Sequence, residues 1–130
     1  MFDKYLVLKA IRRSLTPDFN AGWQYYSHAD NQDGLVSLLI HDIFGGEILK
    51  THKRKGWHFY NRINGERIDL VTSQLSKSSL EKGFEDLPAT PEETLGYVEQ
   101  EDYSTFLVKF TRAFEEAVGL EKSRTSTILA

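Results

Sequence analysis

Three polar side chains, Asp33, His58 and Asp69, have the types and spacing that could support chemistry. Asp33 immediately precedes a long apolar stretch, and His58 and Asp69 lie on either side of Asn64-Gly65. Cysteine hydrolases use a nucleophile, a general base and an orienting carboxylate in this order, and the carboxylate fixes the tautomer of the histidine and raises its basicity. This chain contains no cysteine. The pattern therefore predicts a positioned histidine but no thiol nucleophile.

The dipeptide Asn64-Gly65 is the strongest short hairpin signal in the chain, because both residues tolerate the positive φ angles of a type I′ turn. We expect it to join strands over 57–63 and 66–71. His58 and Asp69 then lie diagonally across one sheet face, about 7 to 8 Å apart at the backbone, which their side chains can span. A surface histidine beside an acid, with no third partner, is the competing interpretation. The predicted pairs are Ile63 with Glu66, Asn61 with Ile68, Tyr60 with Asp69 and Phe59 with Leu70.

The segment 34–44 is predicted to form a helix that is buried almost all round, because its apolar residues cover most of a helical wheel. Asp33 or Asn31 would cap its start, and Gly45-Gly46 would supply the left-handed residue that ends it. Simple capping is the first interpretation of Asp33, since Asp is among the best N-cap residues. The second is a site position, because the start of a helix favours an anion, and thiol enzymes place a nucleophile there.

The remaining patterns predict an α+β fold with flanking N- and C-terminal helices. We expect a single domain over 1–120, in which the helix over 34–44 packs on a small antiparallel sheet, and a frayed polar tail over 121–130. Gly119 is predicted to end the last helix. The other predicted elements are a helix over 2–14, a strand over 47–52, a short helix over 72–82, a helix starting at Thr90-Pro91 and a helix over 101–118.

Length, charge and composition restrict the class of protein. The 130 residues are enough for one core, and a composition of 40% hydrophobic and 27% charged residues is ordinary for a globular protein. The net charge of −3 argues against non-specific nucleic-acid binding. The lack of cysteine suits a reducing compartment, and no segment approaches the ~20 apolar residues of a membrane span. We therefore expect a cytoplasmic protein with no membrane partner.

Three segments of the sequence carry a family resemblance: Gln32 to Ile48, His58-Phe59-Tyr60-Asn61 and Ile68-Asp69-Leu70. Together they resemble the YunG-like family of small uncharacterised proteins. The pattern of that family has Gly-Gln-Cys-Ala before the buried helix, Gly-Gly after it, and then His-Tyr-Trp-Asn and Asp-Leu-Thr. The likeness covers about residues 23 to 75, and the spacing from the nucleophile position to Gly-Gly agrees without gaps. The order of Cys, His and Asp also resembles papain-like and transglutaminase-like folds.

The resemblance places the cysteine position on Asp33, the histidine on His58, the aspartate on Asp69 and the preceding glutamine on Gln32. A carboxylate does not replace a thiolate in forming and breaking an acyl intermediate. The resemblance therefore implies a thiol-lacking relative of cysteine hydrolases that binds a partner protein or a small ligand, with no resident cofactor. The residues expected to line its site are Gln32, Trp23, Tyr60 and Asn61.

Two alternatives stay open. One is a hydrolase that uses Asp33, His58 and Asp69 differently, with or without a metal, since one His and two carboxylates can hold Fe(II), Mn or Zn. The other is anion or nucleic-acid binding through the basic turn over 50–55, because clustered Lys and Arg side chains contact phosphates. A charged turn between strands is more often simply solvated.

Overall fold

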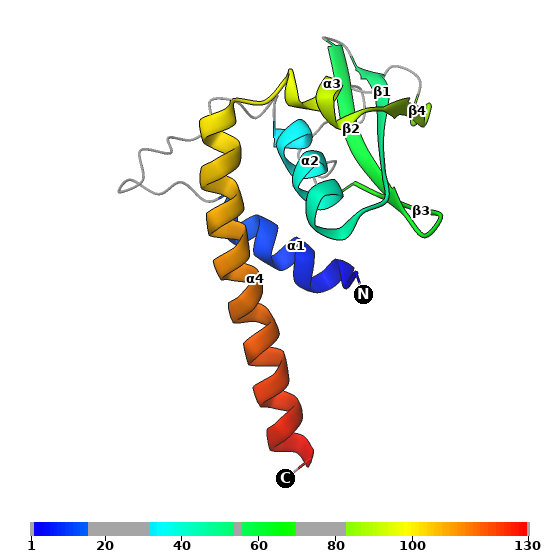
Figure 1. Cartoon of the computed structure of the whole chain (residues 1–130). Coiled ribbons are helices and arrows are strands. Elements are labelled where there is room, and N and C mark those ends of the chain that lie inside the picture. Colours follow the sequence, from blue (N-terminus) through cyan, green and yellow to red (C-terminus); the bar gives the residue numbers. More distant parts are fainter. Residues whose placement is uncertain (1, 16–31, 54–55, 70–82, 130) are drawn as a thin grey trace. The chain divides into compact units, whose positions relative to one another are not determined.

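The computed structural model describes residues 2–15, 32–53, 56–69 and 83–129 of the chain, with side chains up to residue 120. The chain divides into two compact units, one made of residues 1–26 and 104–130 and the other of residues 27–103. Both helices and antiparallel strands are present, which confirms the predicted α+β class (Figure 1). Asp33, His58 and Asp69 all belong to the 27–103 unit.

The 27–103 unit is built on a four-stranded antiparallel sheet with the strand order β3-β2-β1-β4. In the turn between β2 and β3, Asn64 and Gly65 adopt φ angles of 52° and 80°, as the type I′ prediction requires. Asn61 pairs with Ile68, so the predicted register is confirmed up to that residue. The strands are β1 (Glu47–Lys53), β2 (Gly56–Ile63), β3 (Glu66–Ile68) and β4 (Leu87–Ala89).

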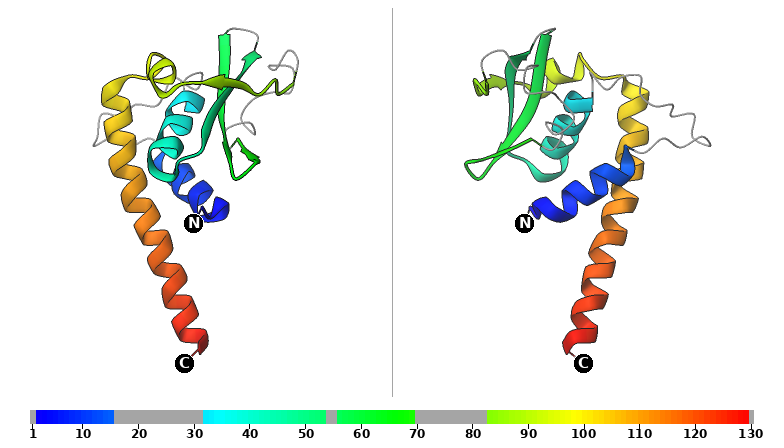
Figure 2. Two further views of the ribbon diagram at one scale, coloured as in Figure 1. Left: turned by 45° about the vertical axis from the view of Figure 1, so that its right-hand side comes forward. Right: turned by 180° about the vertical axis from the view of Figure 1, so that it is seen from behind.

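Helix α2 (Gln32–Phe44) packs against one face of this sheet (Figure 2). It is buried from its second residue for more than two turns, as its apolar composition predicts. The side-chain amide of Asn61 in β2 donates a 3.0 Å hydrogen bond to the carbonyl of Ser37 in the helix. Gly45 and Gly46, both at φ 82°, end the helix where the sequence predicts. The apolar cluster between helix and sheet contains Leu38, Ile48 and Phe59.

Strand β4 and helix α3 (Pro91–Leu95) follow the sheet hairpins. Strand β4 pairs with β1, with Pro88 opposite Leu49. The sequence did not predict β4, because three residues with a central proline give no alternating pattern. Helix α3 begins as predicted, since Thr90 Oγ1 accepts a 3.0 Å hydrogen bond from a backbone N–H of the first turn. The predicted helix over 72–82 lies outside the described residues.

The other unit contains α1 (Lys4–Ser14) and most of α4 (Gln100–Leu129). Helix α1 confirms the predicted N-terminal helix, and Asp3 caps it. The prediction that Gly119 ends the last helix is wrong, because α4 continues to Leu129. A glycine inside a helix costs only about 1 kcal/mol relative to alanine, so it does not force an end. None of the described helices combines the length and the apolar character that crossing a bilayer requires.

Candidate functional site

His58 lies between two carboxylates. Its Nε2 is 2.7 Å from Oδ2 of Asp69, and its Nδ1 is 3.3 Å from Oδ2 of Asp33. The side chain of His58 is fully buried, and those of Asp33 and Asp69 are 5% and 8% exposed. The structure therefore brings together the three residues that the sequence singled out, and the interpretation of His58 as a surface histidine is wrong. We call these three residues the buried cluster.

Asp33 does not cap its own helix. Because α2 begins at Gln32, Asp33 lies within the first turn, and its Oδ2 accepts a 2.7 Å hydrogen bond from the backbone N–H of Phe59. The capping interpretation is therefore wrong. The last described pair between β2 and β3 is Asn61 with Ile68, so Phe59 lies beyond that pairing and its N–H needs another acceptor. The carboxylate of Asp33 supplies that acceptor and joins the helix start to β2.

The surroundings of His58 decide its charge. Burial disfavours the imidazolium, but the neighbouring carboxylates of Asp33 and Asp69 outweigh burial and raise the pKa of His58 from 6.5 to about 9. The contact to Asp33 is close enough for charge pairing but does not have the geometry of a hydrogen bond, so Asp69 is the closer partner and the one that is hydrogen-bonded. At neutral pH both ring nitrogens of His58 therefore carry protons, and neither offers a lone pair to a substrate proton or to a metal.

The predicted lining residues have different roles. Tyr60 stacks beside His58 with 5.8 Å between ring centroids. Asn61 is buried and bonds the backbone of α2, so it fixes the helix to the sheet. Gln32 begins α2, and its buried Oε1 meets no donor among the described residues. Trp23 lies outside the described residues.

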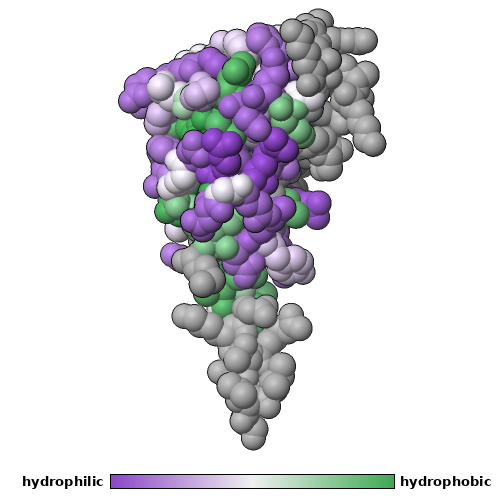
Figure 3. Space-filling model, turned by 90° about the vertical axis from the view of Figure 1, so that its right-hand side faces the viewer, coloured by the Kyte–Doolittle hydropathy of each residue, from purple (hydrophilic) through white to green (hydrophobic). Residues whose placement is uncertain are grey.

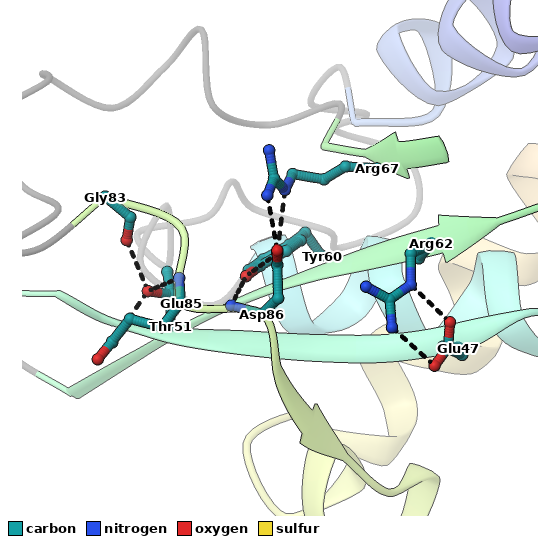
Figure 4. A network of polar contacts seen from close by, with 8 residues as sticks. All are labelled: Glu47, Thr51, Tyr60, Arg62, Arg67, Gly83, Glu85 and Asp86. Carbon is teal, nitrogen blue, oxygen red and sulfur yellow. Dashed lines mark hydrogen bonds and ion pairs between the residues drawn. The ribbon is translucent and has the colours of Figure 1, made fainter. Parts of the chain in front are cut away.

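A second polar network, which the sequence did not predict, fastens residues 83–86 over the sheet (Figure 4). We call residues 83–86 the strap. Thr51, which pairs with His58 across β1 and β2, donates from Oγ1 to the carbonyl of Gly83 at 2.7 Å. The carboxylate of Glu85 is bonded by the backbone N–H of His52, by the ring of His52 and by the hydroxyl of Thr51. These contacts lower the pKa of Glu85 to about 2. The start of the strap is therefore attached to β1 through polar contacts.

The far end of the strap is attached to the β2–β3 hairpin. Asp86 accepts hydrogen bonds of 3.0 and 2.7 Å from the guanidinium of Arg67, which is the main cause that lowers the pKa of Asp86. The hydroxyl of Tyr60 donates to Asp86 Oδ1 at 2.8 Å and accepts from the Asp86 backbone N–H at 2.8 Å. Burial, and then the Asp86 carboxylate, raise the pKa of Tyr60. The only sequence signal for this network is the acidic pair at 85–86.

The other side chains proposed to bind metals or anions are occupied or lie outside the described part of the chain. Within the described ranges, no group of three His, Cys, Asp or Glu side chains is arranged to hold a metal. Lys50, in the predicted basic turn, forms an ion pair with Glu93. Arg62 forms a two-point ion pair with Glu47, with contacts of 2.7 and 3.0 Å. Residues 54–55 of the turn are outside the described residues, so the geometry gives the anion-binding alternative no support.

The fold and the buried cluster define a class: a small α+β protein in which a helix start and a β-hairpin place a histidine between two carboxylates. The chain belongs to the YunG family, because the family model described as "YunG protein" matches residues 4–115. A relative from Bacillus subtilis (strain 168), named "Uncharacterized protein YunG", is 31% identical over 102 residues, which cover 78% of this chain and 86% of the relative. No solved structure matches the chain. The family resemblance seen in the sequence is confirmed.

Proposed function

We propose that this member of the YunG family has no hydrolytic chemistry and acts by binding a partner protein or a small ligand. The observation that carries the proposal is the burial of His58 between two carboxylates, at 2.7 and 3.3 Å, because this arrangement favours the charged form of the ring. An imidazolium cannot take a proton from a nucleophile. Asp33 is itself occupied, since it bonds the backbone of Phe59. The buried cluster therefore suits a structural role, in which it ties α2 to the hairpin.

The order of the three positions supports descent from a papain-like or transglutaminase-like enzyme. In a thiol enzyme the nucleophile is a thiolate that pairs with an imidazolium. A carboxylate at position 33 keeps the negative charge beside His58 but is a much weaker nucleophile than a thiolate toward a carbonyl carbon. We infer that the charge pair was kept and the chemistry was lost. The absence of thiols also fits the cytoplasmic location that we expect.

Hydrolysis assays test the loss of activity. The natural chain and the variants Asp33→Asn and His58→Gln are incubated with chromogenic esters and with peptide amides. We expect all three to match the rate without protein. Turnover by the natural chain that disappears in either variant would overturn the proposal in favour of the hydrolase alternative. A partner that binds the purified chain directly, after capture from the host, would support the binding role.

The variant Asp33→Cys tests the descent of the site. A thiol at this position should become a thiolate beside His58, with a lowered thiol pKa that is read from ultraviolet absorbance and from the rate of alkylation against pH. The double variant Asp33→Cys with His58→Gln should lose this effect. Ile43→Cys is the matched control, because Ile43 lies on the same helix and is 42% exposed. Equal thiol pKa values in all three variants would contradict an ancestral thiol site.

A further inference from the structure

The strap contacts the β2–β3 hairpin as a bound peptide would. The ring of Phe84 lies edge-on to Tyr60, with 5.0 Å between centroids, and 6.5 Å from His58. The guanidinium carbon of Arg67 lies 4.6 Å from the centroid of the Phe84 ring. Such cation–π and edge-to-face contacts favour an aromatic occupant specifically. We call His58, Tyr60 and Arg67 the hairpin receptor.

The strap has a second anchor two residues after the ring. Asp86 binds the fork of Arg67 and the hydroxyl of Tyr60 (Figure 4). These two members of the hairpin receptor also contact the Phe84 ring, so they recognise the ring and the carboxylate together. The chain then runs directly into β4, where Leu87 pairs with Lys50 on the edge of β1. An aromatic anchor, an acidic anchor and main-chain pairing to a sheet edge are the elements by which sheet proteins bind extended peptides.

Several features make the strap replaceable. The side chains of Arg67 and Asp86 are 41% and 30% exposed, and exposed ion pairs contribute little stability. Asp86 has a φ of 56°, a left-handed conformation that is unfavourable for a residue with a Cβ. Strand β4 is only three residues long and contains Pro88. The strap therefore has specific anchors but a short and partly strained attachment.

The side chains next to the strap suit a ligand with one ring and one charge. The rings of Tyr60 and His58 are buried and lie 5.0 and 6.5 Å from the Phe84 ring, between centroids, so a ligand ring in the place of Phe84 would have two aromatic neighbours. Seen from the side on which β3 and β4 lie in Figure 1, the described surface is mostly hydrophilic, with small apolar areas (Figure 3). A partner on this side would gain its specificity from a single aromatic anchor with polar contacts around it.

We propose that the hairpin receptor binds a partner polypeptide segment that carries an aromatic residue followed two positions later by Asp or Glu, and that this segment replaces the strap. The strap is then a built-in occupant that keeps the receptor closed until the partner arrives. This inference rests on the binding function proposed above and names the chemistry of the partner.

A labelled peptide with the sequence of residues 83–89, Gly-Phe-Glu-Asp-Leu-Pro-Ala, tests the receptor by fluorescence anisotropy. In the full chain, Phe84→Ala with Asp86→Ala should loosen the strap and tighten peptide binding by roughly tenfold or more, since the internal competitor is weakened. Adding Arg67→Ala should weaken binding again by roughly tenfold. Adding Arg62→Ala instead is the matched control and should weaken binding by roughly twofold or less, because Arg62 bonds Glu47 and acts on Asp86 only through its charge.

Peptides in which Ala replaces either Phe or Asp should bind weakly to the strap-loosened variant. Equal binding of these peptides and the parent peptide, or no binding to a variant that melts cooperatively, would overturn the proposal. If the variant does not fold, hydrogen exchange of the natural chain decides, since excess peptide should remove the protection of the Asp86 amide. Unchanged protection would count against the receptor.

Two further outcomes distinguish this proposal from association of two copies of the chain and from the binding function proposed above. A dimer of the natural chain that disappears in Phe84→Ala would show that the occupant is the strap of a second copy, contrary to the proposal. If the peptide fails to bind while the natural chain also lacks hydrolytic activity, the receptor is wrong and the non-hydrolytic binding function still stands.

Discussion

Two histidine–carboxylate pairs lie on neighbouring strands of this protein and differ chiefly in their access to water. In the buried cluster, His58 has no exposed surface and two carboxylates. In the strap network, the side chain of His52 is 47% exposed and lies 2.9 Å from Glu85. Water can replace a lost partner in the second pair but not in the first. The comparison indicates that the buried cluster is fixed architecture and the strap network is adjustable.

The largest expected effect is that of His58→Gln. This change removes the positive charge that His58 places between two buried carboxylates, and breaking a buried pair from one side costs about 3 to 5 kcal/mol. The free energy of unfolding, measured in urea, should fall by that amount. His52→Gln is the control and should cost roughly 1 kcal/mol or less. Similar losses in the two variants would remove the distinction between the two pairs.

The stability of the chain should depend on alkaline pH through His58. Its folded pKa is about 9 and its ordinary value is 6.5, so its contribution is fully present below about pH 6.5 and is lost as the pH rises through about 9. The loss from this group alone is of order 3 kcal/mol, at 1.36 kcal/mol for each pH unit. Urea unfolding across this range measures it. In His58→Gln the decline should be absent, and a decline of the same size there would assign it to other groups.

The variant Asp33→Asn tests how much Asp33 contributes to the positive charge on His58. Asparagine keeps an oxygen for the Phe59 N–H but removes the negative charge beside His58, so we expect a loss of roughly 1 to 3 kcal/mol. The pKa of His58 should also fall, which nuclear magnetic resonance titration of its ring protons would measure. Asp69→Asn is the matched variant, because Asp69 contacts the other ring nitrogen of His58. An unchanged His58 pKa in Asp33→Asn would show that Asp69 alone holds the charge.

The smallest expected effect on stability is that of Arg67→Ala. The ion pair with Asp86 is largely exposed, so the free energy of unfolding should fall by only roughly 0.2 to 1 kcal/mol. The local effect should be larger, with faster hydrogen exchange at the Asp86 amide, because the strap loses its fork contact. Protection that survives the change would show that Tyr60 and β4 are enough to hold the strap.

The sequence predicted the hairpin and its diagonal contact correctly for a local reason. Asn64-Gly65 fixes the turn, the turn fixes the register, and the register places His58 within reach of Asp69. The role of Asp33 as a link to Phe59 could not be predicted, because it depends on where the pairing of β3 ends. Capping is a local rule, and here a contact between distant segments overrides it.

The strap could not be predicted, because none of its contacts is local. Asp86 adopts a left-handed φ that its residue type only weakly favours, and its partners, Tyr60 and Arg67, precede it by many positions. The continuation of α4 through Gly119 has a different cause. Glycine permits a left-handed helix end but does not require one, so the sequence signal is ambiguous there.

The hydrogen bond from Phe59 to Asp33 has a consequence for association between molecules. An unpaired backbone donor on a strand edge is a template on which another chain can add a strand. At Phe59 that donor is already bonded to a carboxylate on a buried helix, so an incoming strand would have to displace it and separate the helix from the sheet. The carboxylate of Asp33 therefore leaves no free backbone donor at Phe59 to which another strand could pair.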